Sequence, residues 1–373
     1  MIIREELDSH DRKIGSGWFS GVLALLLASI GLGSVLCICF PQLLTVADVR
    51  EHYNMGSIRL LLHLVLIAAF ALGLTNVVIR EQKALGFIAM TMVMIATLMG
   101  GSRATMRADF ESDIYLGLDF FLLNLIFLGA IFIPLERAFK KYDQAILRYE
   151  WREDLMYFFI STLFVQSLTF LTMLPSMAAL GATQWASGIR EVIANQPIWL
   201  QFLEIMFFTD LVQYWQHRIF HKQHWLWKFH AVHHSAQAMD WLAGSRMHVL
   251  EVIALRAVTT MPMYFLGFVE SALYAYVFFV YILSVFIHSN INLPLGFLQY
   301  VIATPRFHHW HHGVEKEAID VNFAIHFPVI DMVFGTFHMP SDRWPDGYGI
   351  DGHPVPKGLW KQFLYPFSSN KDE

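Results

Sequence analysis

The chain carries three histidine-rich stretches, namely His217-Arg-Ile-Phe-His221, His230-Ala-Val-His233-His234 and His308-His309-Trp-His311-His312. Twelve of the 18 histidines lie between positions 217 and 312. Most of the twelve are three or four residues apart, which is the spacing of one helix face. His217 and His221 therefore leave the same side of a helix, where both imidazoles can bind one cation.

The two HxxHH triplets have a second geometric property. In each triplet the first histidine shares a helix face with the third and nearly with the second, whereas the adjacent last two diverge by about 100°. Each triplet can therefore supply ligands to two metals, and the pattern favours a polynuclear centre. Neutral imidazole binds iron, zinc, copper and nickel, so the ligand type alone does not identify the ion.

An ordinary structural role is the competing interpretation of these histidines. A single histidine in an apolar helix, such as His63, is usually a hydrogen-bonded core residue. Eight histidines in three clusters are different, because without a metal they would lose hydration and would repel one another whenever protonated. We therefore expect a metal site.

The composition of the 373-residue chain is that of an integral membrane protein. Hydrophobic residues make up 55% and charged residues 15%, and the mean hydropathy is +0.45. The net charge of -5 gives no basic surface for nucleic acid. Cys37 and Cys39, the only cysteines, lie two apart in an apolar run, so metal binding must use nitrogen and oxygen ligands.

Apolar runs predict an all-α, polytopic bundle of membrane helices with a histidine-rich cap. The first run is too long for a signal-peptide core, and we expect it to be retained. The expected spans are Trp18 to Phe40, 58–79, 85–100, 116–135, 155–180 and 198–216, followed by an apolar hairpin over 250–287 that is broken near Pro262 and Gly267. We expect membrane helices in 1–150, a catalytic domain in 151–345 and a tail in 346–373.

Lysine and arginine in the short loops predict the orientation of the chain. They are more frequent before the first span and after the second and fourth spans than in the loops between. Even-numbered crossings therefore return to the cytoplasm, and every histidine cluster is expected on that side. The expected location is a bacterial inner membrane or the endoplasmic reticulum.

The order HxxxH, HxxHH, HxxHH, placed after and between apolar helices, resembles the fatty acid hydroxylase and sterol desaturase superfamily over roughly residues 150–340. The supporting segments are Asp210-Leu-Val-Gln-Tyr-Trp-Gln-His217-Arg, Leu-Trp-Lys-Phe-His230, Thr304-Pro-Arg-Phe-His308 and Asp331-Met-Val-Phe-Gly-Thr. Together these segments are highly specific, whereas each alone is weak.

The resemblance implies a helical membrane enzyme with two iron ions (Fe2+/Fe3+) under a cytoplasmic cap. Such an enzyme activates O2 to hydroxylate or desaturate a C–H bond of a sterol, fatty acyl chain or other membrane lipid. The metal ligands that it implies are His217, His221, His230, His233, His234, His308, His311 and His312. Zinc could bind the same ligands as a substitute but could not perform the redox step.

Further site residues follow from the same resemblance. His288 resembles an additional ligand of the family, and Asn292 stands where some relatives have a second histidine. His248 resembles the histidine of an HPxE/D element, with Val249 in place of the proline. Asp210 lies two turns before His217; it could orient that imidazole through a hydrogen bond or make an ordinary polar contact at the end of a helix. We therefore expect His248 and His288 at the metals, and Asn292 and Asp210 as catalytic residues.

Several polar residues near the motifs receive lesser roles. We expect His224 at an interface or in solvent and His309 in packing or behind the ligands. Asp240, Asp320 and Asn322 are candidates for contacts that support the ligands.

Oxygen activation needs two external electrons. The chain has no haem-attachment CxxCH, no iron–sulfur cysteines and no dinucleotide fold, so a separate reductase or electron carrier is expected. The alternative function is a non-oxidative metal-binding or metal-transporting membrane protein. Transport favours ligands at mid-membrane, and here they lie at the ends of the spans.

Overall fold

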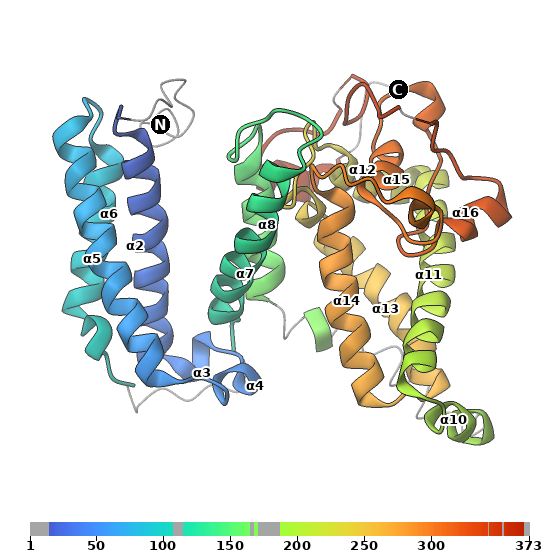
Figure 1. Cartoon of the computed structure of the whole chain (residues 1–373), viewed down its shortest axis with the longest axis horizontal. Coiled ribbons are helices and arrows are strands. Elements are labelled where there is room, and N and C mark those ends of the chain that lie inside the picture. The colour runs from blue at the N-terminus through green and yellow to red at the C-terminus, as the bar shows by residue number, and fades with distance from the viewer. Residues whose placement is uncertain are drawn as a thin grey trace. The chain divides into compact units, whose positions relative to one another are not determined.

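The computed structural model describes residues 15–106, 115–164, 168–170, 187–341, 343–352 and 354–368. Helices dominate these residues, and the extended pairing within them is limited to two isolated bridges, Lys140 with Ile291 and Gly313 with Tyr348. The prediction of an all-α protein is confirmed (Figure 1).

The chain divides into two compact units. Unit 1 comprises residues 1–126 and 162–166, and unit 2 comprises 127–161 and 167–373. The described elements of unit 1 are α2 (Trp18–Cys39), α3 (Pro41–Leu44), α4 (Ala47–Arg50), α5 (Met55–Ile79), α6 (Ala84–Leu98), η1 (Gly101–Arg103) and the first part of α7 (Leu118–Ala138).

Unit 1 is held together by close packing of α2, α5 and α6. The side chain of Asn76 on α5 is buried; its Nδ2 donates to the Gly17 carbonyl oxygen at 2.8 Å, and its Oδ1 accepts from Gly86 N at 3.0 Å. A Cβ at Gly86 would lie 2.5 Å from the carbonyl oxygen of Gly73. Small residues therefore let the three backbones approach closely enough for one buried amide to bond two of them.

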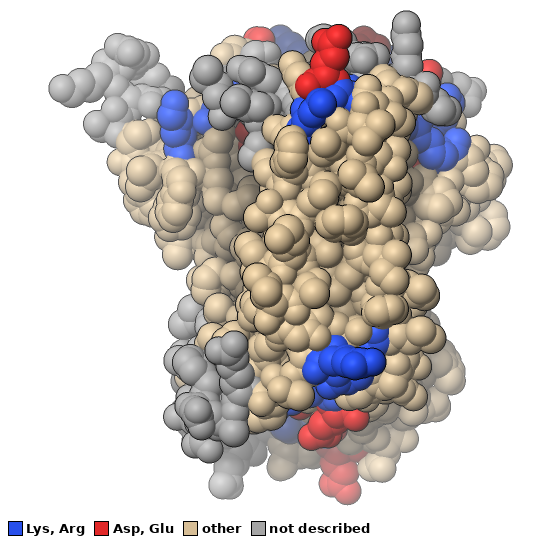
Figure 2. All heavy atoms as spheres, turned by 90° about the vertical axis from the view of Figure 1, so that its left-hand side faces the viewer, with Lys and Arg blue, Asp and Glu red and all other residues tan. Residues whose placement is uncertain are grey.

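The surface of unit 1 is apolar between two charged ends. Figure 2 shows Lys, Arg, Asp and Glu gathered at the two ends of the face turned to the viewer, with uncharged surface between them. Large side chains are open on this surface, including Leu98 at 85% exposure and Val78 at 74%. Such a band suits hydrocarbon rather than water.

In the described part of the chain, six helical segments are long and apolar enough to cross a membrane. They are Trp18–Cys39, Met55–Ile79, Ala84–Arg103, Leu118–Ala138, Val249–Leu266 and Glu270–His288. The first four coincide with the first four predicted spans, and the last two form the predicted hairpin. The prediction of a multi-pass membrane protein is confirmed.

Two other expected spans have different outcomes. The helix α8 (Trp151–Leu163) covers the start of the span expected at 155–180, and most of the remainder lies outside the described residues. The span expected at 198–216 is part of α11 (Ile198–Lys222), which is not among the six apolar segments. The buried polar side chains of Gln201, Thr209 and Asp210 lower its hydropathy.

The expected break at Pro262 is wrong. The helix α13 (Val249–Leu266) continues through this proline and ends at Gly267, whose φ of 74° is left-handed. A proline removes one backbone donor and can be accommodated where neighbouring groups adjust. A left-handed residue instead turns the chain out of the helix, so only Gly267 separates α13 from α14 (Glu270–His288).

Unit 2 places the short helices α12 (His224–His234) and α15 (Pro305–His311) at one end of longer ones. Figure 1 shows α11, α13 and α14 as long helices and α12 and α15 as short ones. Besides α8, α11, α13, α14 and the end of α7, the described elements of unit 2 are α10 (Ser187–Ala194), α12 (His224–His234), η2 (Ala243–Ser245), η3 (Gly296–Tyr300), α15 (Pro305–His311), η4 (Lys316–Ala318), α16 (Pro328–Phe334), α17 (Leu359–Leu364) and η5 (Tyr365–Phe367). In unit 2 α11 packs against α12, α13 and α14, and α14 packs against α15.

Candidate metal centre

Among the residues that the structure describes, nine histidines of unit 2 gather into two groups. The ligand nitrogens within each group lie within 4.8 Å of one another. The first group is His217, His221, His230, His234 and His311, and the second is His233, His288, His308 and His312. His217 and His311, which are 94 residues apart in the sequence, therefore meet in one group, as a shared metal centre requires.

Each HxxHH triplet divides between the two groups. In the first triplet His230 and His234 belong to the first group and His233 to the second. In the second triplet His308 and His312 belong to the second group and His311 to the first. The i and i+4 residues thus stay together while the i+3 residue turns to the other group, which fits the predicted use of both triplets by two sites.

Local structure explains how the short helix α15 presents its histidines. Thr304 caps its start by accepting a hydrogen bond from Phe307 N at 3.3 Å, and Pro305 occupies the first turn, where its missing N–H costs nothing. The His288 ligand is the last residue of α14. Helix ends therefore bring both sets of imidazoles to one place.

Backbone carbonyls fix the proton position on four of these rings. Nδ1 donates to a carbonyl oxygen in His217 (Phe323, 2.8 Å), His233 (Arg246, 2.9 Å), His288 (Ser284, 2.7 Å) and His311 (Val321, 2.8 Å). A carbonyl oxygen only accepts, so Nδ1 carries the hydrogen. In a neutral ring Nε2 is then an unprotonated lone pair, which is the form that binds metal.

The spacing between facing nitrogens fits a coordination shell. Nε2 of His233 and Nε2 of His288 are 3.3 Å apart, although neither carries a hydrogen to share. Five further Nε2 pairs within the groups lie 2.9–3.1 Å apart. Metal–nitrogen bonds of about 2.1 Å at tetrahedral or right angles give nitrogen separations of about 2.9–3.4 Å. The groups therefore have the size and donor chemistry of metal sites.

Burial keeps the α12 and α15 ligands neutral. Loss of hydration, together with the neighbouring imidazoles, lowers the pKa of His230, His233 and His234 well below 6.5. The same causes lower the pKa of His308, His311 and His312. Neutral imidazoles offer lone pairs to a cation without competition from protons near neutral pH.

Two carboxylates support ligands of the first group. Oε1 of Glu251 lies 2.5 Å from Nδ1 of His230, and both side chains are buried. Oδ1 of Asp320 lies 3.4 Å from Nδ1 of His221, and the Asp320 pKa falls to about 2 because of His221 and Lys222. Both carboxylates orient Nε2 toward the group. The sequence signal for Glu251 was its place in the segment Arg246-Met-His248-Val-Leu-Glu251.

The structure places His248 apart from the two groups. Its Nδ1 caps α13 by accepting from Leu250 N at 3.2 Å, and its Nε2 donates to the Phe363 carbonyl oxygen at 3.0 Å. Its ring also stacks on Phe363. Both nitrogens are thus occupied, and His248 belongs to neither group. In this segment the residue that reaches the site is Glu251.

Asn292 and Asp210 also lie apart from the two groups. Asn292 is exposed, and its backbone N–H donates to the Phe139 carbonyl oxygen at 2.7 Å. The buried Asp210 carboxylate accepts from the backbone N–H groups of residues 325, 326 and 327 at 2.7–3.1 Å, not from the His217 ring. Asp210 instead fixes the segment that presents the Phe323 carbonyl oxygen to His217.

The remaining candidates lie around this segment and near α15. Asn322 has a φ of 55°, and its Nδ2 donates to the Phe307 carbonyl oxygen at 2.8 Å. His309 has Nδ1 2.7 Å from the Tyr348 hydroxyl and belongs to neither group, as expected. His224 is exposed. Asp331 begins one of the segments that carry the family resemblance, and the sequence assigned it no role of its own. Its Oδ1 accepts a hydrogen bond from Phe323 N at 2.8 Å.

A buried ion network holds the carbonyl that orients His233. Arg246 contacts Asp154 at 2.5 Å and Glu150 at 2.8 Å, while Arg148 contacts Asp154 at 2.5 Å and Asp240 at 2.8 Å. The Arg246 carbonyl oxygen accepts from His233. The network therefore fixes a backbone atom of the site as well as the chain around it.

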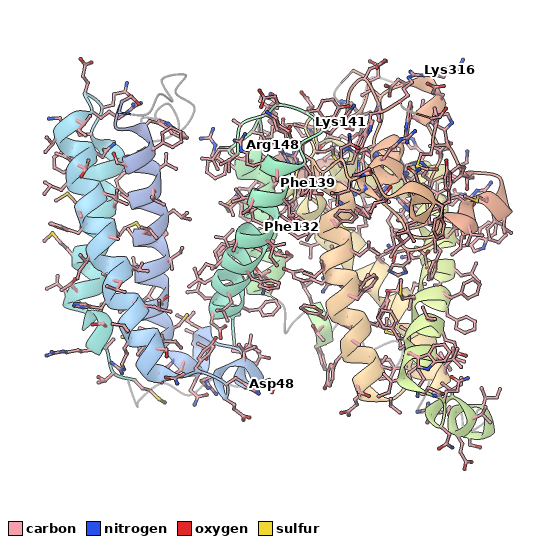
Figure 3. All side chains as sticks on the ribbon, in the orientation of Figure 1. Asp48, Phe132, Phe139, Lys141, Arg148 and Lys316 are labelled. Carbon is pink, nitrogen blue, oxygen red and sulfur yellow. The ribbon has the colours of Figure 1, made fainter. Side chains whose placement is uncertain are left out.

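The end of α7 anchors the residues after His288. Figure 3 shows Phe132 on α7, Phe139 directly after its last residue, and Arg148 in the segment that follows. Between the two phenylalanines, Glu136 Oε1 accepts from Trp241 N at 2.8 Å and from Asn290 N at 3.0 Å. A single carboxylate thus joins the segment before α13 to the segment after α14.

Comparisons with known proteins agree with this geometry. Residues 202–336 match the model of the fatty acid hydroxylase family, a range that holds all nine histidines of the two groups. Ornithine lipid hydroxylase from Rhizobium tropici is 32% identical over 42% of this chain and 46% of its own length. Alkylglycerol monooxygenase from Danio rerio is 31% identical over 45% of this chain and 36% of its own length.

A plant relative extends the range of activities. Very-long-chain aldehyde decarbonylase from Oryza sativa is 31% identical over 36% of this chain and 23% of its own length. The chain thus spans less than half the length of these curated relatives. No solved structure matches it. The histidine groups and the matched range together show that residues 202–336 form a domain of the fatty acid hydroxylase family.

Proposed function

We propose that this protein is a membrane-bound, metal-dependent oxidoreductase that uses O2 to hydroxylate a C–H bond of a membrane lipid. The observation that carries the proposal is the pair of adjacent, buried all-histidine groups. The family match and relatives named as lipid hydroxylase and alkylglycerol monooxygenase support the choice of reaction and substrate class. We propose 151–345 as the catalytic domain, with its histidines on the cytoplasmic side.

The proposed metal is a pair of iron ions, one for each group. Zinc fits the same nitrogens but is redox-inert, so it could not support oxidation by O2. When bound, the irons would supply the activation of O2. Neutral imidazole ligands would leave the positive charge of the irons uncompensated.

The chain's own residues perform the positioning. Carbonyl oxygens of Phe323, Arg246 and Ser284 hold three Nδ1 protons and so aim Nε2 of His217, His233 and His288 at the metal sites. All nine ligands except His221 are buried, and this arrangement limits access of bulk water. Two electrons would come from a separate reductase or electron carrier.

Metal transport accounts less well for this arrangement. A transport site is expected at the membrane midplane between discontinuous helices. Here His288 is the last residue of a candidate span, and the other eight ligands lie outside the six candidate spans. A fixed site at one end of the helices suits catalysis on a membrane lipid.

The proposal is tested with the full chain purified in detergent. We expect about two irons per chain and, with lipid extract, reductant and O2, a product that gains one oxygen by mass spectrometry. His233→Ala should lose metal and product together. Turnover by metal-free protein, or metal flux in proteoliposomes without lipid oxidation, would contradict the proposal.

A further inference from the structure

Arg256 is out of place in an apolar helix. It is the only lysine or arginine between residues 249 and 288, and it is the eighth residue of α13, a candidate membrane span. Its side chain is exposed at the surface of the protein. A charged group in such a segment is costly unless it is paired, and it is therefore a candidate functional residue.

No carboxylate in the described part of the chain forms an ion pair with Arg256. Glu251, on the same helix, bonds to His230 and lies about 140° around the axis from Arg256. Glu270, the other acid between 249 and 288, begins α14 beyond the far end of α13. The N–H donors of the Arg256 guanidinium are therefore available to an acceptor on a bound ligand.

Tyr281 on α14 adds a second polar group. α13 and α14 are consecutive candidate spans, and the Tyr281 phenol lies within electrostatic range of the Arg256 guanidinium. The Tyr281 hydroxyl oxygen is buried and has no hydrogen-bond partner among the described residues. A buried hydroxyl without a partner is unfavourable, so a ligand atom that accepts its hydrogen would stabilise it.

Both side chains lie near the metal centre along their helices. Arg256 is five residues after Glu251, about 7.5 Å along the axis of α13. Tyr281 is seven residues before His288 and on the same face, about 10 Å along the axis of α14. A lipid bound here by a polar group could therefore place a nearby carbon at the histidine groups.

We infer that Arg256 and Tyr281 form a binding site for the phosphate or carboxylate group of an anionic lipid, which is the substrate of the metal centre. A guanidinium matches these planar or tetrahedral anions with two parallel hydrogen bonds, and the phenol donates a third. The inference rests on the proposed function, because it takes the bound lipid to be the substrate. It adds the chemical class of that lipid.

The test is binding of simple amphiphiles to the full chain in dodecyl maltoside, measured by calorimetry. Dodecyl phosphate and dodecanoate should bind about tenfold or more tightly than dodecanol. Arg256→Gln should weaken binding of the two anions by about ten- to a hundredfold and leave dodecanol unchanged. Tyr281→Phe should give a smaller loss, and Arg256→Lys should retain part of the affinity.

The matched control is Arg137→Gln, which removes an exposed arginine from the last turn of another candidate span, α7. It should bind the anions as the unaltered chain does. If Arg256→Gln bound the anions as tightly as the unaltered chain does, the inference would be overturned. Arg256 would then be an arginine that only reaches toward phospholipid headgroups. Tight binding of inorganic phosphate alone would also overturn the lipid assignment.

The binding result is separable from the proposed function. Arg256-dependent anion binding without lipid oxidation would support the binding site and contradict the enzyme. Oxidation of neutral lipids that Arg256→Gln leaves unchanged would support the enzyme and overturn the binding site.

Discussion

The buried carboxylate of Glu251 lies 2.5 Å from Nδ1 of the metal-group residue His230. This contact joins the first turn of α13 to α12, and it fixes which nitrogen of His230 faces the other imidazoles. Carboxylate–histidine–metal arrangements of this kind raise the basicity of the ligand. Glu251 is therefore expected to support metal binding without contacting the metal.

Glu251→Ala should lower metal affinity by about ten- to a hundredfold, because His230 loses the acceptor that orients it. Glu251→Gln should bind metal more tightly than Glu251→Ala, since its amide oxygen can still accept from Nδ1. The measurement is metal content per chain after dialysis against graded chelator. Glu270→Gln, an exposed change at the start of α14, is the control and should match the unaltered chain. Full metal content in Glu251→Ala would contradict this role.

The contrast between Glu251 and His248 shows where sequence reasoning reaches its limit. Helical spacing was enough to predict that His230 and His234 share a helix face, that His233 and His234 diverge, and that the triplet can serve two metals. The role of His248 depends on where α13 begins. His248 is the residue that caps the start of this helix, so its ring bonds to the backbone N–H of Leu250. Local periodicity does not determine that boundary to within one residue.

Contacts between residues far apart in the chain could not be predicted from the sequence either. Asp210 bonds to backbone groups more than 100 residues away, and nothing in the spacing near His217 indicates those partners. The same is true of Arg246 and Asp154, which are 92 residues apart. Span positions, by contrast, follow from the length of apolar runs, so the hairpin of α13 and α14 was predictable.

His248→Ala should leave metal content unchanged while lowering the free energy of unfolding by about 1 kcal/mol, the usual effect of losing a helix cap. The reason is that both of its ring nitrogens bond within the protein, to Leu250 N and to the Phe363 carbonyl oxygen. Metal analysis and thermal unfolding in detergent measure the two effects separately. Loss of one metal per chain would instead make His248 a ligand, as the family resemblance implied.

Asp210→Ala should destabilise the protein strongly, because one buried carboxylate accepts three backbone N–H groups from residues 325–327. Each buried donor left without a partner costs about 1–3 kcal/mol, so a loss of roughly 3 kcal/mol or more is expected. The segment also presents the Phe323 carbonyl oxygen to His217, so the metal affinity of the first group should fall as well. If Asp210→Ala left both the free energy of unfolding and the metal content unchanged, the conformation of residues 325–327 would not depend on this carboxylate.

Asp154→Asn should be the most destabilising neutralisation on the cap, because Asp154 pairs with both Arg148 and Arg246 and all three side chains are buried. Removing one partner of a buried ion pair costs about 3–5 kcal/mol, since it leaves charge without compensation. Glu317→Gln is the matched control: it breaks an ion pair with Arg343 that is nearly half exposed, and it should cost less than about 1 kcal/mol. Thermal unfolding of the three proteins in the same detergent gives the comparison. The Arg246 carbonyl oxygen orients His233, a residue of the second group. Asp154→Asn should therefore also lose metal from the second group before it loses metal from the first. Equal loss of metal from both groups would contradict this coupling.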